Sequence, residues 1–150
     1  MRNLAAVLPL LLPKAIAWAE SEERRVQRDG RALSPDERVV AVDVGVRDPQ
    51  RVRVLLVEEL PQPEDPVLRE AGREAGLLGP TMIGRTFGHA VSIRRGHLSR
   101  RTLSHELRHV AQYEESGGIA SFLPVYLAKV LEYGYASAPF EVDARRHETE

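Results

Sequence analysis

Two histidines lie four residues apart around a glutamate within the segment SRRTLSHELRHVAQYEESGG, residues 99–118. On a helix, His105 and His109 share one face, so both imidazoles can reach a point about 2 Å away, the usual zinc-to-nitrogen distance. Glu106 lies beside that face, where its carboxylate can act as general base on a zinc-activated water without being a ligand. The HExxH spacing therefore predicts a zinc site with two histidine ligands and Glu106 as the catalytic base.

A solvated helix face with a salt-bridged Glu106 is the alternative interpretation of this segment. Chance alone would give roughly 0.02 matches to HExxH in a chain of this length and composition. The two histidines also avoid the apolar stripe of their helix, which leaves them free to bind a metal. That stripe, which we expect to face the core, consists of Leu103, Leu107, Val110 and Ala111.

The motif leaves the third metal ligand open. A catalytic zinc ion normally takes three protein ligands and keeps its fourth position for water or substrate. The chain contains no cysteine, so the third ligand must be a histidine, an aspartate or a glutamate. Glu115 stands where the extended pattern HExxHxxGxxH has its third histidine. The third ligand must therefore come from another element.

The composition indicates one domain. The chain has 150 residues, of which 43% are hydrophobic, and this is enough for a single core over residues 1–150. Its 21 basic and 22 acidic residues give a formal charge of -1, so we expect no nucleic-acid partner. One local basic cluster is interpreted as a solvated face, with an acidic substrate or partner as the alternative: Arg94, Arg95, Arg100 and Arg101.

The helix that carries the histidines has clear signals at both ends. Ser99 can cap its first turn, and Leu98 and Leu103 have the spacing of a hydrophobic staple. We expect this helix to end at Gly117. A half-exposed strand is expected shortly before it, over residues 89–95, because apolar and polar side chains alternate there.

Other elements follow from local patterns. A capping box predicts a short helix over residues 34–43, although its β-branched segment VVAVDVGV could also form a strand. Further β-branched residues predict a strand over 51–60. We expect a short helix over residues 67–75 and glycine-rich turns between residues 76 and 96. Downstream, a helix with Ser121 as its N-cap and a last helical segment over residues 140–148 are predicted.

The N-terminal region holds an apolar run that Pro9 and Pro13 interrupt. We expect a helix from Pro13 to Asp29. The N-terminal segment that contains it, residues 1–30, is expected to pack on the rest of the domain or to cover it. The apolar stretch is judged too short to span a membrane. A cytoplasmic location is expected from the lack of cysteine, and secretion through a signal peptide is the alternative.

The segments HELRH and PFEVDARRHE together resemble the gluzincin metallopeptidases, and specifically their small single-domain relatives, the minigluzincins. The resemblance covers roughly residues 85–148. It implies an α+β, zincin-like fold in which a small twisted sheet packs on the HExxH helix. It also implies that the strand over 89–95 is an edge strand that can receive an extended substrate, and that Glu141 is the third zinc ligand.

The glutamate helix departs from the larger gluzincins at one position. These enzymes often carry an aspartate four residues after the ligand glutamate, whereas this chain has Arg145. The orienting role of that aspartate is therefore vacant or falls to Asp143, which is also the alternative metal ligand. A charge placed favourably at a helix start is the alternative interpretation of Glu141.

Several further side chains are candidates for substrate contacts. A tyrosine could stabilise an oxyanion, although a packed ring with a solvated hydroxyl is the more common role. A histidine beside the predicted strand could bind a substrate carbonyl, although we expect the histidines outside the motif to lie on the surface. The tyrosines are Tyr113, Tyr133 and Tyr135, the histidines beside the strand are His89 and His97, and His147 is expected to be an exposed residue near the chain end.

The sequence thus predicts a zinc-dependent peptidase or amide hydrolase with one Zn²⁺ ion, acting on a peptide or protein in an extended conformation. His105, His109 and Glu141 would hold the metal, and Glu106 would be the base. One alternative is a zinc-binding regulatory or interaction domain without hydrolytic activity. The other is a scaffold without metal.

Overall fold

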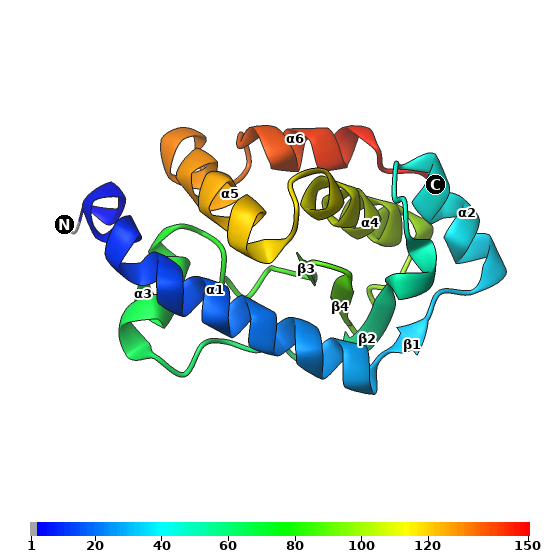
Figure 1. Cartoon of the computed structure of the whole chain (residues 1–150), viewed down its shortest axis with the longest axis horizontal. Helices are drawn as coiled ribbons and strands as arrows, with labels where there is room; N and C mark the ends of the chain where they lie inside the picture. The colour runs from blue at the N-terminus through cyan, green and yellow to red at the C-terminus, as the bar shows by residue number, and fades with distance from the viewer. Residues whose placement is uncertain (1–2) are drawn as a thin grey trace.

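The computed structural model describes residues 3–150, which form an α+β fold (Figure 1). Six α-helices and a four-stranded sheet occur within the described residues. In chain order the elements are α1 (Leu4–Asp29), β1 (Arg31–Ala32), α2 (Pro35–Asp43), a 3₁₀ turn (Pro49–Arg51), β2 (Arg53–Val57), α3 (Pro66–Glu74), β3 (Gly84–Phe87), β4 (Ala90–Arg94), α4 (Arg100–Glu115), α5 (Ile119–Tyr133) and α6 (Pro139–Arg146).

The small mixed sheet has the strand order β1-β2-β4-β3. Strands β2 and β4 are parallel, and the other two pairs are antiparallel. Helices α2 and α4 cover one face, where Val54, Val91 and Ile93 pack against Leu107 in the main core. Helix α1 lies along the opposite face (Figure 1). The helix with the histidines is therefore held against the sheet by its apolar stripe, as predicted.

The prediction that residues 89–95 form a half-exposed edge strand is wrong. Strand β4 lies between β2 and β3, and its first four residues are buried. The small side chains of Ala90 and Ser92 suggested an exposed face, but α1 covers that face. The edge strand beside α4 is β3, in a segment for which we expected only turns. Gly84, the first residue of β3, and Gly88, directly after it, hid the strand pattern.

The N-terminal helix is longer than predicted. It begins at Leu4, with Asn3 as its N-cap, and contains Pro9 and Pro13. A proline inside a helix lacks a backbone donor and crowds the carbonyl four residues earlier. The surrounding leucines and alanines are strong helix formers and favour continuation of the helix. The helix is long and apolar enough to cross a membrane by length and composition. The prediction that the apolar stretch is too short to span a membrane is therefore wrong.

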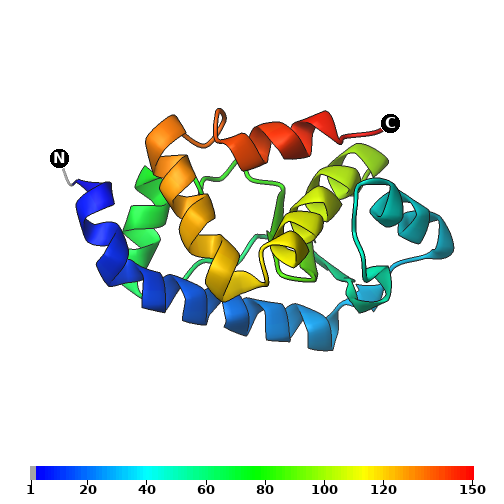
Figure 2. The same cartoon turned by 45° about the horizontal axis from the view of Figure 1, so that its top comes forward.

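The predicted helices over residues 34–43 and 67–75 correspond closely to α2 and α3, and the capping box is present in α2. Helix α4 is capped by Ser99 as expected. Helix α5 starts earlier than predicted, after Gly118 rather than Ser121, because Gly118 adopts a positive φ of 114° that turns the chain sharply after α4. Figure 2 shows α6 lying across the ends of α4 and α5 that are farther from α1.

Candidate metal centre

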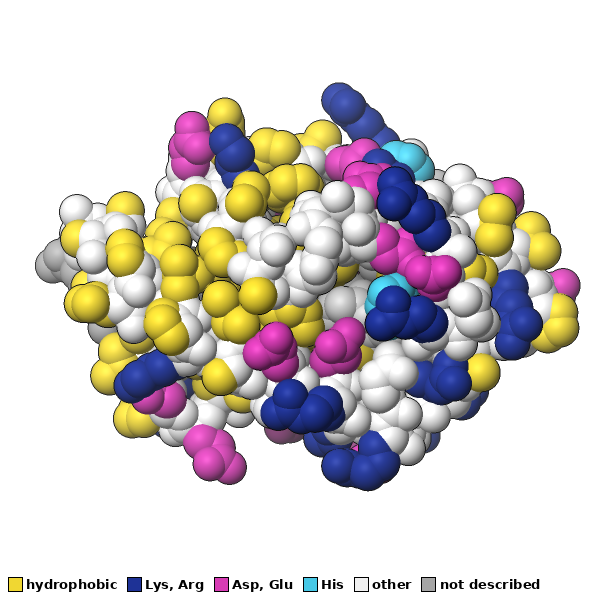
Figure 3. Space-filling model, in the orientation of Figure 1, with side chains coloured by type: hydrophobic (Ala, Val, Ile, Leu, Met, Phe, Trp, Pro, Cys, Tyr) yellow, Lys and Arg dark blue, Asp and Glu magenta, His cyan; other side chains and the backbone are white. Residues whose placement is uncertain are grey.

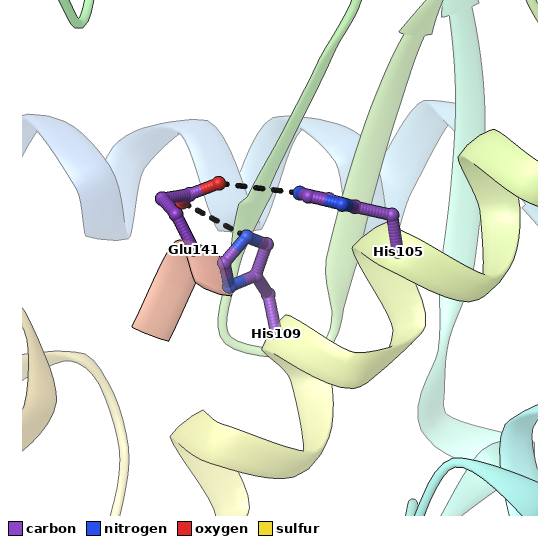
Figure 4. Close-up of side chains that lie close together, drawn as sticks. All are labelled: His105, His109 and Glu141. Carbon is purple, nitrogen blue, oxygen red and sulfur yellow. Dashed lines mark hydrogen bonds and ion pairs between the residues drawn. The ribbon is translucent and has the colours of Figure 1, made fainter. Parts of the chain in front are cut away.

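Three potential metal ligands converge between α4 and α6 (Figure 4). The Nε2 atom of His105 lies 3.2 Å from Glu141 Oε1, and the Nε2 atom of His109 lies 3.0 Å from Glu141 Oε2. Glu141 and His109 are buried, with exposed fractions of 2% and 7%. The structure thus brings together the three residues that the sequence analysis proposed as ligands.

The donor set fits a zinc ion. Zinc bound tetrahedrally to nitrogen and oxygen at about 2.0–2.1 Å needs neighbouring donor atoms about 3.3 Å apart. The two nitrogen-to-oxygen distances are close to this value, and one ligand atom from each residue lies within 4.8 Å of the others. Two imidazoles and one carboxylate are also the donors of many catalytic zinc sites, which keep a fourth position open.

A carboxylate outside the ligand set orients His105. The Nδ1 atom of His105 lies 2.8 Å from Glu148 Oε2, and Arg101 Nε donates to Glu148 Oε1 at 2.8 Å. An imidazole that donates from Nδ1 presents the lone pair of Nε2 to a metal. Glu148 follows α6 and is 43 residues from His105, so no local sequence pattern indicates this contact.

A second chain of contacts orients His109. Gln112 Oε1 lies 2.7 Å from His109 Nδ1, and Gln112 Nε2 donates to Asp143 Oδ2 at 2.8 Å. Arg108 Nε also donates to Asp143 Oδ2, at 2.7 Å. Asp143 therefore does not join the ligand cluster but supports it through Gln112. Each of the two histidines therefore has a protein acceptor beside its Nδ1 atom. The arginine at position 145, where larger gluzincins often carry an orienting aspartate, does not leave either histidine without an orienting contact.

The Glu148→Gln variant is expected to lower zinc affinity by about tenfold to a hundredfold, because a neutral amide makes His105 a weaker ligand and orients it less firmly. Zinc affinity can be measured by competition with a chromophoric chelator. Glu150→Gln, an exposed change two residues away, should leave the affinity unchanged. Equal affinities for both variants would contradict the role of Glu148.

Glu106 lies beside the cluster without belonging to it. Its side chain is buried, and its Oε1 atom accepts a hydrogen bond of 2.8 Å from Thr86 Oγ1 on β3. Gly84 permits this contact, because a Cβ atom there would lie 2.9 Å from Glu106 Oε2. Glu106, His109 and Glu141 all line one cavity of about 160 Å³. Glu106 is therefore held where it can reach a molecule in front of the cluster.

Three tyrosines line the cavity, and a fourth lies outside it. Tyr126, which the sequence analysis missed, donates to Glu141 Oε2 at 2.7 Å. Tyr113 and Tyr135 line the cavity, whereas Tyr133 is half exposed, stacks with Lys129 and does not line the cavity. Burial, together with the charges of Glu141 and Glu106, raises the pKa of Tyr135 above its ordinary value. Its hydroxyl thus remains a hydrogen-bond donor at neutral pH.

The remaining histidines lie outside the cluster. His89 is buried, so the expectation of a surface position was wrong, and its Nε2 atom lies 2.9 Å from Glu114 Oε2. Glu114 also accepts from the backbone nitrogens of residues 47 and 48, so these contacts hold a loop. His97 is exposed, and His147 is partly buried against the Asp143 carbonyl.

The cluster couples the ionisation of its members. Burial lowers the pKa of His105, but the hydrogen bond with Glu141 and the charge of Glu106 outweigh burial and raise it to about 9. The pKa of His109 is also raised, by its hydrogen bond with Glu141 against the effect of burial. Burial raises the pKa of Glu141, but hydrogen bonds from His105 and His109 outweigh it and hold that pKa well below its ordinary value.

The metal-free protein is expected to lose thermal stability as the pH rises from 6.5 to about 9. A histidine whose folded pKa is raised stabilises the protein fully below its unfolded pKa of 6.5, and this contribution is lost as the pH passes about 9. Glu141, with a lowered pKa, contributes above its ordinary value of 4.5 and loses that contribution in acid. The expected decrease in Tm is several degrees, measurable by calorimetry with a chelator present.

Zinc should stabilise the protein more as the pH rises, because zinc binds neutral imidazoles and must displace their protons at lower pH. The rise in Tm on adding zinc is therefore expected to be larger near pH 9 than below pH 6.5. A zinc effect that is independent of pH would show that His105 and His109 are not the groups that release protons.

No family model, curated protein or solved structure matches this chain. The case for a metal site therefore comes from the arrangement of His105, His109 and Glu141 alone.

Proposed function

We propose that this protein is a zinc-dependent peptidase or amide hydrolase with a zincin-like fold that resembles the minigluzincins. The observation that carries the proposal is the convergence of His105, His109 and Glu141, with Glu106 in the cavity that His109 and Glu141 also line. Such a constellation suits hydrolysis, because it combines a metal site with a general base that is not a ligand.

When bound, zinc would polarise the scissile carbonyl and lower the pKa of a water molecule. The Glu106 carboxylate would take the proton of that water and later deliver it to the leaving amine. Thr86 holds the Oε1 atom of Glu106, which leaves Oε2 free for the proton. The protonated hydroxyl of Tyr135 would donate a hydrogen bond to the oxygen on which negative charge develops.

Strand β3 supports an extended peptide as the substrate. It is the last strand of the sheet beside α4, and within residues 3–150 its outer edge pairs with no other strand. Its residues Gly84–Phe87 line the cavity next to Glu106. A substrate could therefore add a strand to this edge and place a peptide bond in front of the metal cluster.

A zinc-binding domain without hydrolytic activity is the second candidate. The first turns of α1 wall the cavity, which has a volume of only about 160 Å³. Cavities that bind drug-sized ligands usually measure about 300–1,000 Å³. A cavity of this size leaves little room for a substrate in front of the metal cluster, which favours the second candidate.

The test is metal analysis of the purified protein followed by hydrolysis of an unfolded protein substrate. We expect one zinc ion per chain, cleavage that a chelator abolishes, and recovery when zinc is returned. Zinc without cleavage would favour the second candidate. Failure to bind zinc after supplementation would contradict both candidates.

A further inference from the structure

The first turns of α1 are apolar on every side. Residues 4–13, LAAVLPLLLP, contain no charged or polar side chain. One face, with Leu4, Leu8 and Leu11, lines the cavity. The opposite face points outward, and there Leu10 is 76% exposed. A helix that meets both a protein surface and water should carry polar residues on its outer face, and this segment carries none.

This segment is not a core helix. Only 17% of the most apolar 18-residue stretch of α1 is buried. Two further exposed apolar side chains lie on helices that contact α1: Val67 on α3 is 48% exposed and Val125 on α5 is 47% exposed. Figure 3 shows apolar side chains gathered over the half of this face that holds the start of α1, and charged side chains gathered over the other half.

The second half of α1 is fixed to the domain. Ala19 and Val26 are buried, and the His89 backbone nitrogen donates to Glu23 at 3.1 Å. Lys14 forms an ion pair of 2.7 Å with Asp65 directly after the apolar segment. To span a membrane, α1 would have to leave the sheet and take these charged residues into the bilayer, which is costly. Within α1, only residues 4–13 can therefore enter a lipid bilayer while the rest of the helix stays packed on the domain.

We propose that residues 4–13 insert into one leaflet of a lipid bilayer, with the exposed apolar surfaces of α3 and α5 resting at the interface. A helix that docks in a groove on a partner protein usually borders its apolar stripe with polar residues, whereas the whole exposed surface of this segment is apolar, which suits lipid. At 1.5 Å per residue this segment measures about 15 Å, about half of a hydrocarbon core of about 30 Å. Its length thus suits one leaflet. This proposal does not depend on zinc or on hydrolysis.

The first test is co-sedimentation of the full chain with vesicles of phosphatidylcholine and phosphatidylglycerol, at low and at high salt. The parent protein should bind at both, because burial of apolar surface resists screening. Leu10→Glu should reduce binding by at least about tenfold. Val42→Glu on α2, where Val42 is 59% exposed at the other end of the molecule, is the matched control and should bind like the parent (Figure 1). Equal binding of both variants would overturn the proposal.

The second test locates the inserted residues. Because the chain has no cysteine, Leu10→Cys and Val42→Cys each carry a single site for an environment-sensitive fluorophore. On vesicles, the label at position 10 should shift to the blue and be quenched by quenchers placed in the acyl chains, whereas the label at position 42 should not respond. A label at position 10 that stays in water on vesicles would overturn the proposal. A blue shift without vesicles, together with a larger species in gel filtration, would instead assign this surface to a second copy of the chain.

Discussion

Glu106→Gln is expected to retain one zinc ion per chain while its hydrolytic turnover decreases by about a hundredfold to ten-thousandfold, the usual contribution of a general base. The amide can still accept the Thr86 hydrogen bond through its oxygen, so the local packing should persist. It cannot take a proton from water, and therefore the chemical step should fail while the metal site remains. Turnover and zinc content, measured on the same preparation, separate these two properties.

The control for this variant is Glu115→Gln, which changes an exposed glutamate on the same helix. It should hydrolyse the substrate at the parental rate. A Glu106→Gln protein with parental turnover would refute the proposed mechanism. If Glu106→Gln instead lost its zinc, Glu106 would be a ligand rather than a base, and the reading of the HExxH segment would have to change.

The parts of the site that lie on one helix could be predicted because their signals are local. Ser99 marks the start of α4, and the apolar stripe through Leu107 fixes which face packs on the sheet. The four-residue spacing then places His105 and His109 on a face that is free to approach α6. Glu141 could be found only through resemblance to a known motif, because nothing in its own helix indicates what it contacts.

The supporting contacts could not be predicted in the same way, because they join distant parts of the chain. Thr86 is 20 residues from Glu106, and Tyr126 is 15 residues from Glu141. Helical periodicity carries no information about such pairs, which depend on how β3 and α5 pack around α4. The edge strand was missed for a related reason, since its glycine Gly84 reads as a turn but serves the close approach of Glu106.

The start of α1 was misjudged because proline was given too much weight. Pro9 and Pro13 suggested a break, yet the helix continues through both, with Leu11 and Ala15 buried. Recognising one helix from Leu4 changes how its apolar end is understood. The apolar residues before Pro13 belong to the same helix whose later residues pack on the sheet.

Glu141→Gln should weaken zinc binding by at least about a hundredfold, more than the loss of an orienting group would cause. The carboxylate lies within 3.2 Å of both imidazoles and is 2% exposed. Its charge therefore acts at short range with little screening by water. A neutral amide of the same shape would keep the packing against Tyr126 but would be a poor zinc ligand. Chelator competition gives the affinity, and calorimetry checks that the variant remains folded.

Asp143→Asn provides the decisive comparison, because Asp143 was the alternative ligand. Its carboxylate binds Arg108 and Gln112 in the structure, so it acts on the site only through His109. Its loss should lower zinc affinity by about tenfold to a hundredfold, less than the loss of Glu141. If Asp143→Asn removed zinc and Glu141→Gln did not, Asp143 would be the third ligand. The order of the two effects therefore decides which carboxylate of α6 completes the metal centre.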